Sequence, residues 1–245
     1  MIPLDPESVN VLSWLRIRSL EYLRQKAEGR EDPEMKREIL EDLVNAYSPG
    51  RLRGVFERAS KLLDSQKKAL ESHKYIVFDF RAVTRSRLLV GMSSEIFGKQ
   101  LFEVGMSWDQ NLNLPYIPAS SLKGAFRAYV ELNRPDVSGL LGEKGEISSV
   151  TFLNSYPVDA RENLIAPEVT TPIYREQEGR MRESEASPNP VIYPVVNKGV
   201  TFRIIAGVRS EKRILADQLG LFMKEVLLEG IGAKTMLGYG VLEIP

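Results

Sequence analysis

The first third of the chain carries apolar residues at the three- and four-residue spacing of a helix. This spacing predicts helices over about 6–26, 32–46 and 52–72, with Pro33 in the first turn of the second. A Ser-Pro-Gly break at 48–50 separates the second helix from the third. In the first helix, the apolar positions that carry the pattern are Val9, Leu12, Leu15, Ile17, Leu20 and Leu23.

From residue 75 onward, short β-branched and aromatic runs alternate with helical patterns. Residues 82–91 are interpreted as a second strand or as an extension of the first. The other expected elements, in chain order, are strand 75–80, helix 120–133, strand 147–156, strand 199–208, helix 211–229 and strand 239–244. In the last helix, one apolar stripe consists of Leu215, Leu219, Phe222 and Val226.

The order of these elements resembles the βαββαβ pattern of ferredoxin-like folds. We therefore predict an α+β protein in which a helical region over 1–73 packs on a core over 74–245. A proline-rich connection of mixed charge, about 157–193, interrupts this core. Connections of that length are usually functional or disordered.

The composition of the chain limits which kinds of binding and catalysis are possible, and it says less about the fold. Lys plus Arg and Asp plus Glu both number 33, so binding to nucleic acid would need a local patch. The lack of cysteine excludes disulfides, thiolate metal ligands and thiol catalysis, and one histidine leaves few routes to His-based catalysis. No signal-like start and no apolar run long enough for a membrane span are visible, so we expect a cytoplasmic location.

The segment 114–127 has the features of an anion-binding helix start. Two prolines hold the approach extended, and Ser120 is expected to cap the helix, leaving backbone N–H groups that suit phosphate. Lys123 and Arg127 share a polar flank, with Gly124 beside them. The apolar face of the same helix consists of Leu122, Ala125, Phe126, Tyr129 and Val130. The alternative is an ordinary capped amphipathic helix with solvated charges.

A second segment, 230–240, follows the last helix and contains four glycines. Glycines permit positive φ and outward backbone N–H groups, while Lys234 and Thr235 add a charge and a hydroxyl, a set that suits a phosphate backbone. The run looks like the end of a Walker A loop. That motif needs Gly before the Lys, where Ala233 stands, and a strand before it with a helix after it. A helix cap and turn would explain Gly230, and a continuation of that turn Gly232, but not all four glycines.

In their pairing, order and separation, the two segments resemble the RAMP proteins of type III CRISPR–Cas systems. These proteins carry a Pro-x-Ile-Pro-Gly-Ser-Ser-x-Lys-Gly-x-x-Arg element, similar to 115–127, and a C-terminal Gly-rich loop, similar to 230–240. Other segments are similar to the family of sixth subunits of the type III-B Cmr complex. They are Glu103-Val-Gly105, Glu168-Val-Thr-Thr-Pro-Ile-Tyr174, and Pro188-Asn-Pro-Val-Ile-Tyr193 with Gly199-Val-Thr-Phe202. Two positions depart from the pattern, Ala119 in place of Gly and Ile173 in place of His.

The resemblance implies a ferredoxin-like (RRM-like) core and a backbone subunit that binds guide RNA (crRNA) in antiviral defence without cutting it. Expected partners are crRNA, target RNA and other Cmr and RAMP subunits, with no metal, cofactor, small molecule or membrane. The residues expected to contact RNA are Ser120, Ser121, Lys123, Gly124, Arg127, Gly230, Gly232, Lys234, Thr235, Gly238 and Tyr239.

Two alternatives belong to other classes of function. The first is a CRISPR-RNA processing endoribonuclease, which would need an acid–base pair and has only His73 as a histidine. We expect His73 to be an ordinary histidine at a helix end, and Glu95 is a single carboxylate without a partner in its motif. The second alternative is a protein-only scaffold subunit, in which the glycine loop is simply a turn.

Overall fold

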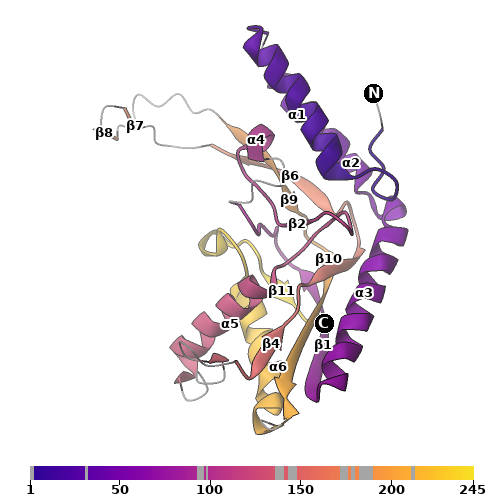
Figure 1. Ribbon diagram of the computed structural model, residues 1–245. Coiled ribbons are helices and arrows are strands. Elements are labelled where there is room, and N and C mark those ends of the chain that lie inside the picture. Colours follow the sequence, from indigo (N-terminus) through magenta and orange to yellow (C-terminus); the bar gives the residue numbers. More distant parts are fainter. Residues whose placement is uncertain are drawn as a thin grey trace.

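The computed structural model describes residues 3–30, 33–92, 97, 99–135, 141–142, 148–171, 176–177, 180–181, 190–210 and 213–245. Helices and antiparallel strands both contribute to the fold, which confirms the predicted α+β class (Figure 1). Glu95 and Ile173 lie outside the described residues. In the described part of the chain, no helix has the length and apolar character needed to cross a membrane.

The N-terminal helices are α1 (Val11–Ala27), α2 (Pro33–Ala46) and α3 (Arg53–Ser72), with a 3-10 turn at Pro49–Arg51 between the last two. All three predicted helices are present with nearly the predicted ends, except that α1 begins at Val11 and not at residue 6. Asn10 is the N-cap of α1, and its side-chain oxygen accepts a hydrogen bond from the Ser13 N–H. The residues before it form a turn in which Asp5 accepts bonds from the Ser8 and Val9 N–H groups.

The central sheet combines β1 (Tyr75–Thr84), β4 (Val150–Phe152), β5 (Tyr156–Ala160), β10 (Val200–Arg209) and β11 (Leu242–Glu243). The strand order is β11-β1-β10-β4, with β5 also pairing with β10, and all of these pairs are antiparallel. Helix α5 (Ala119–Asn133) lies between β1 and β4 in the chain, and α6 (Arg213–Glu229) lies between β10 and β11. The predicted order of alternating strands and helices is therefore present.

Several predicted boundaries need correction. The first strand ends at Thr84 and does not continue to residue 91, because the β-bridge that residues 85–91 make, from Leu88 to Val196, is isolated and extends no ladder. The single strand expected over 147–156 is interrupted, and β4 and β5 pair with different parts of β10. The start of the predicted excursion, Pro157 to Ala160, belongs to β5 and so to the sheet. The last strand covers Leu242–Glu243 alone, which leaves Tyr239 in the preceding loop.

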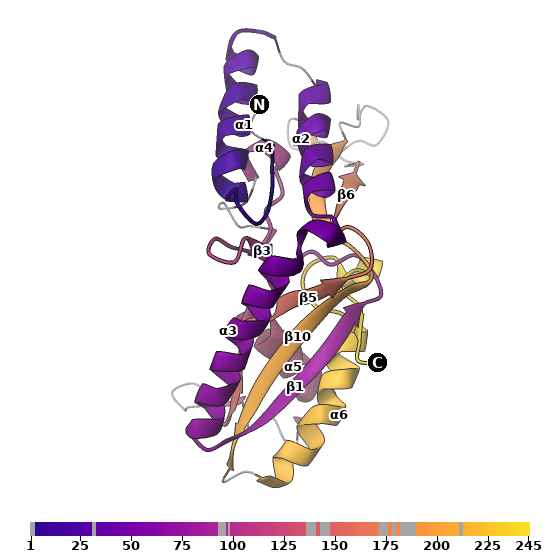
Figure 2. The same cartoon turned by 90° about the vertical axis from the view of Figure 1, so that its right-hand side faces the viewer.

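Helices cover both faces of the sheet (Figures 1 and 2). On one face, α5 and α6 bury their apolar stripes, and the Phe126 ring lies 5.5 Å from the Phe152 ring of β4. On the other face α3 crosses the strands, as Figure 2 shows. There Arg203 of β10 bonds Asp79 of β1 at 2.8 and 2.7 Å, and its third nitrogen contacts Asp64 of α3 at 2.8 Å.

The long excursion contains a two-stranded hairpin of β6 (Ile165–Thr170) and β9 (Val191–Val196), paired from Ile165–Val196 to Thr170–Val191. This hairpin packs beside α2 above the central sheet (Figure 1). The remaining short elements are α4 (Lys99–Phe102), β2 (Trp108–Asp109) with β3 (Leu114–Pro115), and β7 (Glu176–Gln177) with β8 (Arg180–Met181). The β6–β9 hairpin also supplies hydrogen-bond partners for side chains of the Gly-rich loop, residues 230–240.

Candidate functional site

The start of α5 is capped differently from the prediction. Pro118 is the N-cap residue, so Ser120 already lies inside the helix and its side chain caps nothing. The Ala119 N–H donates instead to Asn154 Oδ1, at 2.9 Å, from the connection between β4 and β5. Because Pro118 has no hydroxyl or carboxyl group to offer, a residue distant in sequence provides the cap.

The polar flank of α5 contains both free and engaged cations. Lys123 is half-buried and has no hydrogen bond or ion pair among the described residues, and the space around Gly124 is open. Ser120 is exposed and Ser121 half-buried beside them. Arg127, in contrast, donates to the carbonyl oxygens of Leu141 and Gly142 at 3.1 and 3.2 Å. Of the two cations predicted on this flank, Lys123 is therefore accessible, and Arg127 is hydrogen-bonded to the backbone at 141–142.

The Gly-rich loop, residues 230–240, is tied to the segment that follows β1. The Ala233 N–H donates to the Leu89 carbonyl at 2.8 Å, and the Gly240 N–H donates to the Arg87 carbonyl at 2.8 Å. Within the loop, the Ile231 N–H bonds the Gly240 carbonyl at 2.9 Å. A 3-10 turn at Thr235–Leu237 forms the tip, which excludes the strand-loop-helix order of a Walker A site.

All four glycines of the loop have positive φ, and three of them have tight surroundings. A Cβ atom at Gly240 would lie 2.0 Å from the Ile231 oxygen, and one at Gly232 would lie 2.5 Å from the Leu89 oxygen. A Cβ at Gly230 would lie 3.0 Å from the Tyr239 oxygen, whereas Gly238 faces open space. Closure of the loop thus explains more of the glycines than the sequence suggested, and Gly238 alone is open at the tip.

Lys234 does not point freely into solvent. Its Nζ donates to Thr170 Oγ1 at 2.8 Å and to Tyr193 Oη at 2.6 Å, and these two oxygens are themselves 2.8 Å apart. The ammonium also lies 5.1 Å from the centroid of the Tyr193 ring and 5.8 Å from that of the Tyr239 ring. The residue has φ of 61°, a left-handed conformation that these contacts help to hold.

A second part of the same network centres on Glu168, which is almost fully buried. Its Oε2 accepts bonds from Tyr239 Oη at 2.6 Å and from Arg87 Nη1 at 2.7 Å. Burial pushes the pKa of Glu168 upward, but the bonds from Tyr239 and Arg87 outweigh it and hold the pKa below its usual value. Burial, together with the bond to Glu168, raises the pKa of Tyr239 to about 12.

The network therefore clamps the Gly-rich loop to the β6–β9 hairpin. The predicted residues Lys234 and Tyr239 form the loop side, while Glu168, Thr170 and Tyr193 form the hairpin side. The hairpin residues were not among the predicted contacts, although all three stand in the sequence elements that carried the resemblance. The sequence held these residues in two separate motifs, 168–174 and 188–193. The pairing of β6 with β9 is what brings the residues of both motifs to the Gly-rich loop.

The two predicted motifs lie at the same end of the helical layer. Tyr129 of α5 donates to Glu225 of α6, and the Arg134 guanidinium lies 4.8 Å over the Phe222 ring. The later residue of α5, Arg134, therefore contacts the earlier residue of α6, and the earlier residue, Tyr129, contacts the later one. The two helices consequently run in opposite directions. The start of α5, with Lys123, consequently lies toward the end of α6, where the Gly-rich loop begins.

His73, the histidine that an endoribonuclease would need, lies far from the Gly-rich loop. His73 is an exposed helix-end residue whose Nδ1 lies 2.8 Å from the Ala69 carbonyl, as expected. It precedes the ten-residue strand β1, whereas the loop is tied to residues beyond that strand, about 30 Å away at 3.3 Å per residue. Within the described residues, no group of three or more His, Asp or Glu side chains could hold a metal ion.

Comparison with known proteins identifies the class. The model of the RAMP superfamily matches residues 13–243, so this chain belongs to the RAMP superfamily, and a ferredoxin-like core is the fold which that membership implies. The chain is 35% identical over 213 residues to the CRISPR system CMR subunit Cmr6 of Saccharolobus solfataricus, covering 85% of this chain and 70% of that protein. It is thus a member of the Cmr6 family of type III-B Cmr systems, which confirms the predicted resemblance.

Solved structures agree with this assignment. A chain of the cryo-EM structure of the type III-B Cmr-β complex bound to cognate target RNA superposes with a TM-score of 0.84 at 26% identity. That match covers 97% of this chain and 91% of the other. A chain of the apo Cmr-β structure is 13% identical with a TM-score of 0.50, covers 69% of this chain and 96% of its own length, and shows similarity of fold alone.

Proposed function

We propose that this protein is a guide-RNA-binding backbone subunit of a type III-B Cmr effector complex, and that it does not cut RNA. The phosphate backbone of the crRNA lies across the end of the helical layer where the start of α5 meets the Gly-rich loop. The observation that carries this proposal is the convergence there of the predicted motifs with an open backbone position, Gly124, and an open loop tip at Gly238. A cation lies beside them, Lys123, which has no hydrogen bond or ion pair with any residue that the structure describes.

The predicted contact residues divide into two roles. Lys123, Gly124, Ser120 and Ser121 have access to a ligand, and Lys123 supplies the charge that neutralises a phosphate. Lys234 and Arg127 are engaged with protein atoms, so their main contribution is to hold the loop and the end of α5 in shape. Both hydrogen-bond partners of Lys234, Thr170 and Tyr193, are hydroxyl groups and not carboxylates.

The covered face of the central sheet supports an RNA site at the Gly-rich loop and the start of α5. RRM-type proteins stack single-stranded bases on the open face of a four-stranded sheet. In this chain α3 covers that face, and the Arg203–Asp79–Asp64 cluster fixes it there. The likeness to RRM proteins is therefore one of strand order, and RNA binding falls to the loops at the edge.

Chemistry at the site favours binding over cleavage. RNA cleavage without metal needs a base and an acid that exchange protons near neutral pH. Tyr239, with its pKa raised to about 12, stays protonated there, and Glu168, with its lowered pKa, stays ionised and already accepts two hydrogen bonds. Neither is suited to move a proton, so target cleavage is assigned to another subunit.

The partners follow from the family. The relatives are a CMR subunit and a chain of a type III-B complex bound to cognate target RNA. We accordingly assign this chain crRNA, target RNA and the neighbouring Cmr subunits as partners, and the cytoplasm as its location.

The test is a titration of labelled crRNA against the protein, alone and with purified neighbouring subunits, at two salt concentrations. Lys123→Glu is compared with Lys68→Glu, a matched charge reversal at an exposed position of α3 that leaves the proposed RNA-binding surface unchanged. We expect Lys123→Glu to weaken binding by about tenfold or more and to lower the salt dependence, since it removes a phosphate contact. Equal binding by both variants would favour the protein-only scaffold, and shortened RNA in the same lanes would favour the endoribonuclease.

A further inference from the structure

Helix α1 is apolar on two faces, and only one of them is covered. The core-facing side is buried, through Val11, Leu12, Trp14, Leu15 and Tyr22. On the other side Ile17, Leu20 and Leu23 are exposed by 53%, 67% and 42%. The sequence pattern grouped Leu12 and Leu15 with these three residues, whereas the structure buries Leu12 and Leu15 and leaves the three exposed. Figure 1 shows the C-terminal half of α1 projecting beyond the body of the molecule.

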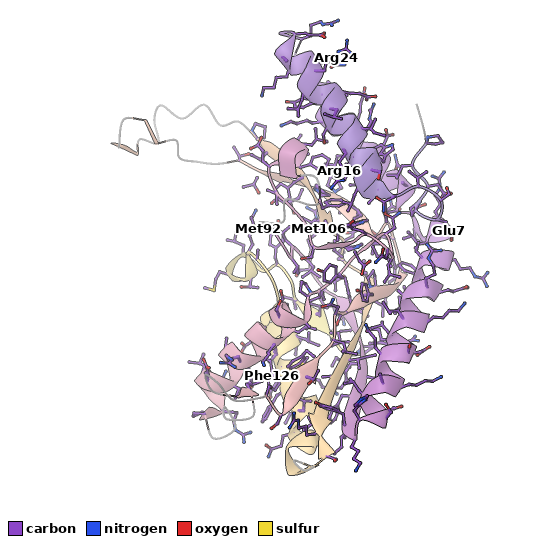
Figure 3. All side chains as sticks on the ribbon, in the orientation of Figure 1. Glu7, Arg16, Arg24, Met92, Met106 and Phe126 are labelled. Carbon is purple, nitrogen blue, oxygen red and sulfur yellow. The ribbon has the colours of Figure 1, made fainter. Side chains whose placement is uncertain are left out.

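The exposed face has a defined shape and charge. At 100° per residue, the side chains at 13, 16, 17, 20, 23, 24 and 27 share one side of the helix, and all of them are exposed. Leu20 lies at its centre, four residues from Arg16 on one side and from Arg24 on the other. Figure 3 labels these two arginines on α1. We call this surface the α1 outer face.

The charge of the α1 outer face is positive. Arg16 has no partner among the described residues, and Arg24 shares the Glu28 carboxylate with Arg30. The other nearby carboxylate, Glu21, is paired with Arg18 at 2.8 Å. Leu20 thus stands between two arginines whose Cα atoms are about 12 Å apart along the helix axis.

We infer that the α1 outer face docks a helix of another protein subunit, one with an apolar stripe flanked by carboxylates at the spacing of Arg16 and Arg24. Exposed apolar stripes with charged rims mark protein interfaces, and burial of Ile17, Leu20 and Leu23 would drive the contact. Arginine, with its planar guanidinium, forms bidentate bonds with carboxylates. This inference rests on the proposed function insofar as the partner is a subunit of the same complex.

Other occupants fit less well. A second copy of α1, packed in either direction, would bring arginine against arginine, because the pattern is symmetric about Leu20. RNA would satisfy Arg16 and Arg24 but would leave three aliphatic side chains against a charged phosphate backbone. A protein helix with carboxylate flanks satisfies the apolar and the charged positions together.

The experiment uses the absence of cysteine from the chain. Leu20→Cys introduces a single thiol at the centre of the α1 outer face, and Leu132→Cys places one at the exposed end of α5, where the leucine is 81% exposed. The rate of maleimide modification of each variant is followed by mass, alone, with crRNA, and with each purified Cmr subunit in turn. Ser13→Cys, on the same face and nearly isosteric, serves as a second probe should loss of Leu20 weaken docking.

We expect one protein subunit to slow modification of Leu20→Cys or Ser13→Cys at least tenfold and to leave Leu132→Cys unchanged. An Arg16→Glu, Arg24→Glu double variant should lose that protection, whereas Arg53→Glu, a matched reversal on exposed α3, should keep it. Protection by crRNA alone, protection that rises with the concentration of this chain alone, or no protection in any mixture would each overturn the inference. Loss of RNA binding in Lys123→Glu tests the proposed function separately, since that variant leaves the α1 outer face intact.

Discussion

Two glycines of the Gly-rich loop allow the closure of the loop to be tested with a matched pair of variants. Gly232 and Gly238 both have positive φ, 93° and 82°, so alanine at either position adopts a left-handed conformation. That conformation costs about 1–2 kcal/mol for a residue with a Cβ atom. The new methyl group at 238 meets open space, whereas the one at 232 would lie 2.5 Å from the Leu89 oxygen and 2.9 Å from Val90 Cγ2.

The difference between the variants comes from that contact. A Cβ atom cannot stay 2.5 Å from a backbone oxygen, so the loop must move away from residues 89–90. The movement removes the Ala233–Leu89 hydrogen bond, which contributes about 0.5–1.5 kcal/mol. We therefore expect Gly238→Ala to lower the free energy of unfolding by about 1–2 kcal/mol and Gly232→Ala by about 1.5–3.5 kcal/mol.

Urea denaturation of both variants and the parent protein, fitted with a common slope, measures these values. The RNA titration adds an independent comparison, because Gly238→Ala places a methyl group on the open tip and should weaken binding more than its stability change predicts. If Gly232→Ala proved no less stable than Gly238→Ala, the glycine at 232 would not be required by close backbone approach. The account of the loop as a closed, anchored turn would then be wrong.

Three further outcomes follow from the same contacts. Asn154→Ala removes the acceptor for the Ala119 N–H and should destabilise the protein by about 0.5–2 kcal/mol in urea, while Ser120→Ala should not, because Ser120 caps nothing. Tyr193→Phe removes one acceptor from Lys234 and keeps the ring beneath its ammonium, and it should lower the free energy of unfolding in urea by about 1.5–3 kcal/mol. Glu168 has a pKa below its ordinary value of 4.5, so its contribution to stability is complete above that pH and is lost as the pH falls through the lower value. Glu168→Gln should therefore be less stable at neutral pH and should flatten the acid limb of the stability profile; an unchanged acid limb would contradict the assignment.

The sequence by itself determined where the main helices lie and which two segments carry the candidate RNA-binding motifs. Helical spacing identified α1, α2 and α3, because amphipathic periodicity over several turns depends only on which side chains face a core. The same holds for α5 and α6, whose stripes bury Leu122, Phe126 and Leu219 as the pattern predicted. The α5 motif and the Gly-rich loop were found because proline and glycine at those spacings act on the backbone directly, and because the lysines add a charge that suits phosphate.

Only the tertiary structure decided which of those residues are free. Lys123 and Lys234 look equivalent in sequence, yet the β6–β9 hairpin engages Lys234 and leaves Lys123 without a partner among the described residues. The cap of α5 comes from Asn154, and the need for glycine at 232 comes from Leu89, contacts between residues far apart in the chain. Periodicity reports that a position is apolar but not whether the fold supplies something to cover it, so α1 alone could not reveal its uncovered face. These features depend on how the chain packs over long sequence separations, and local propensity carries no information about that packing.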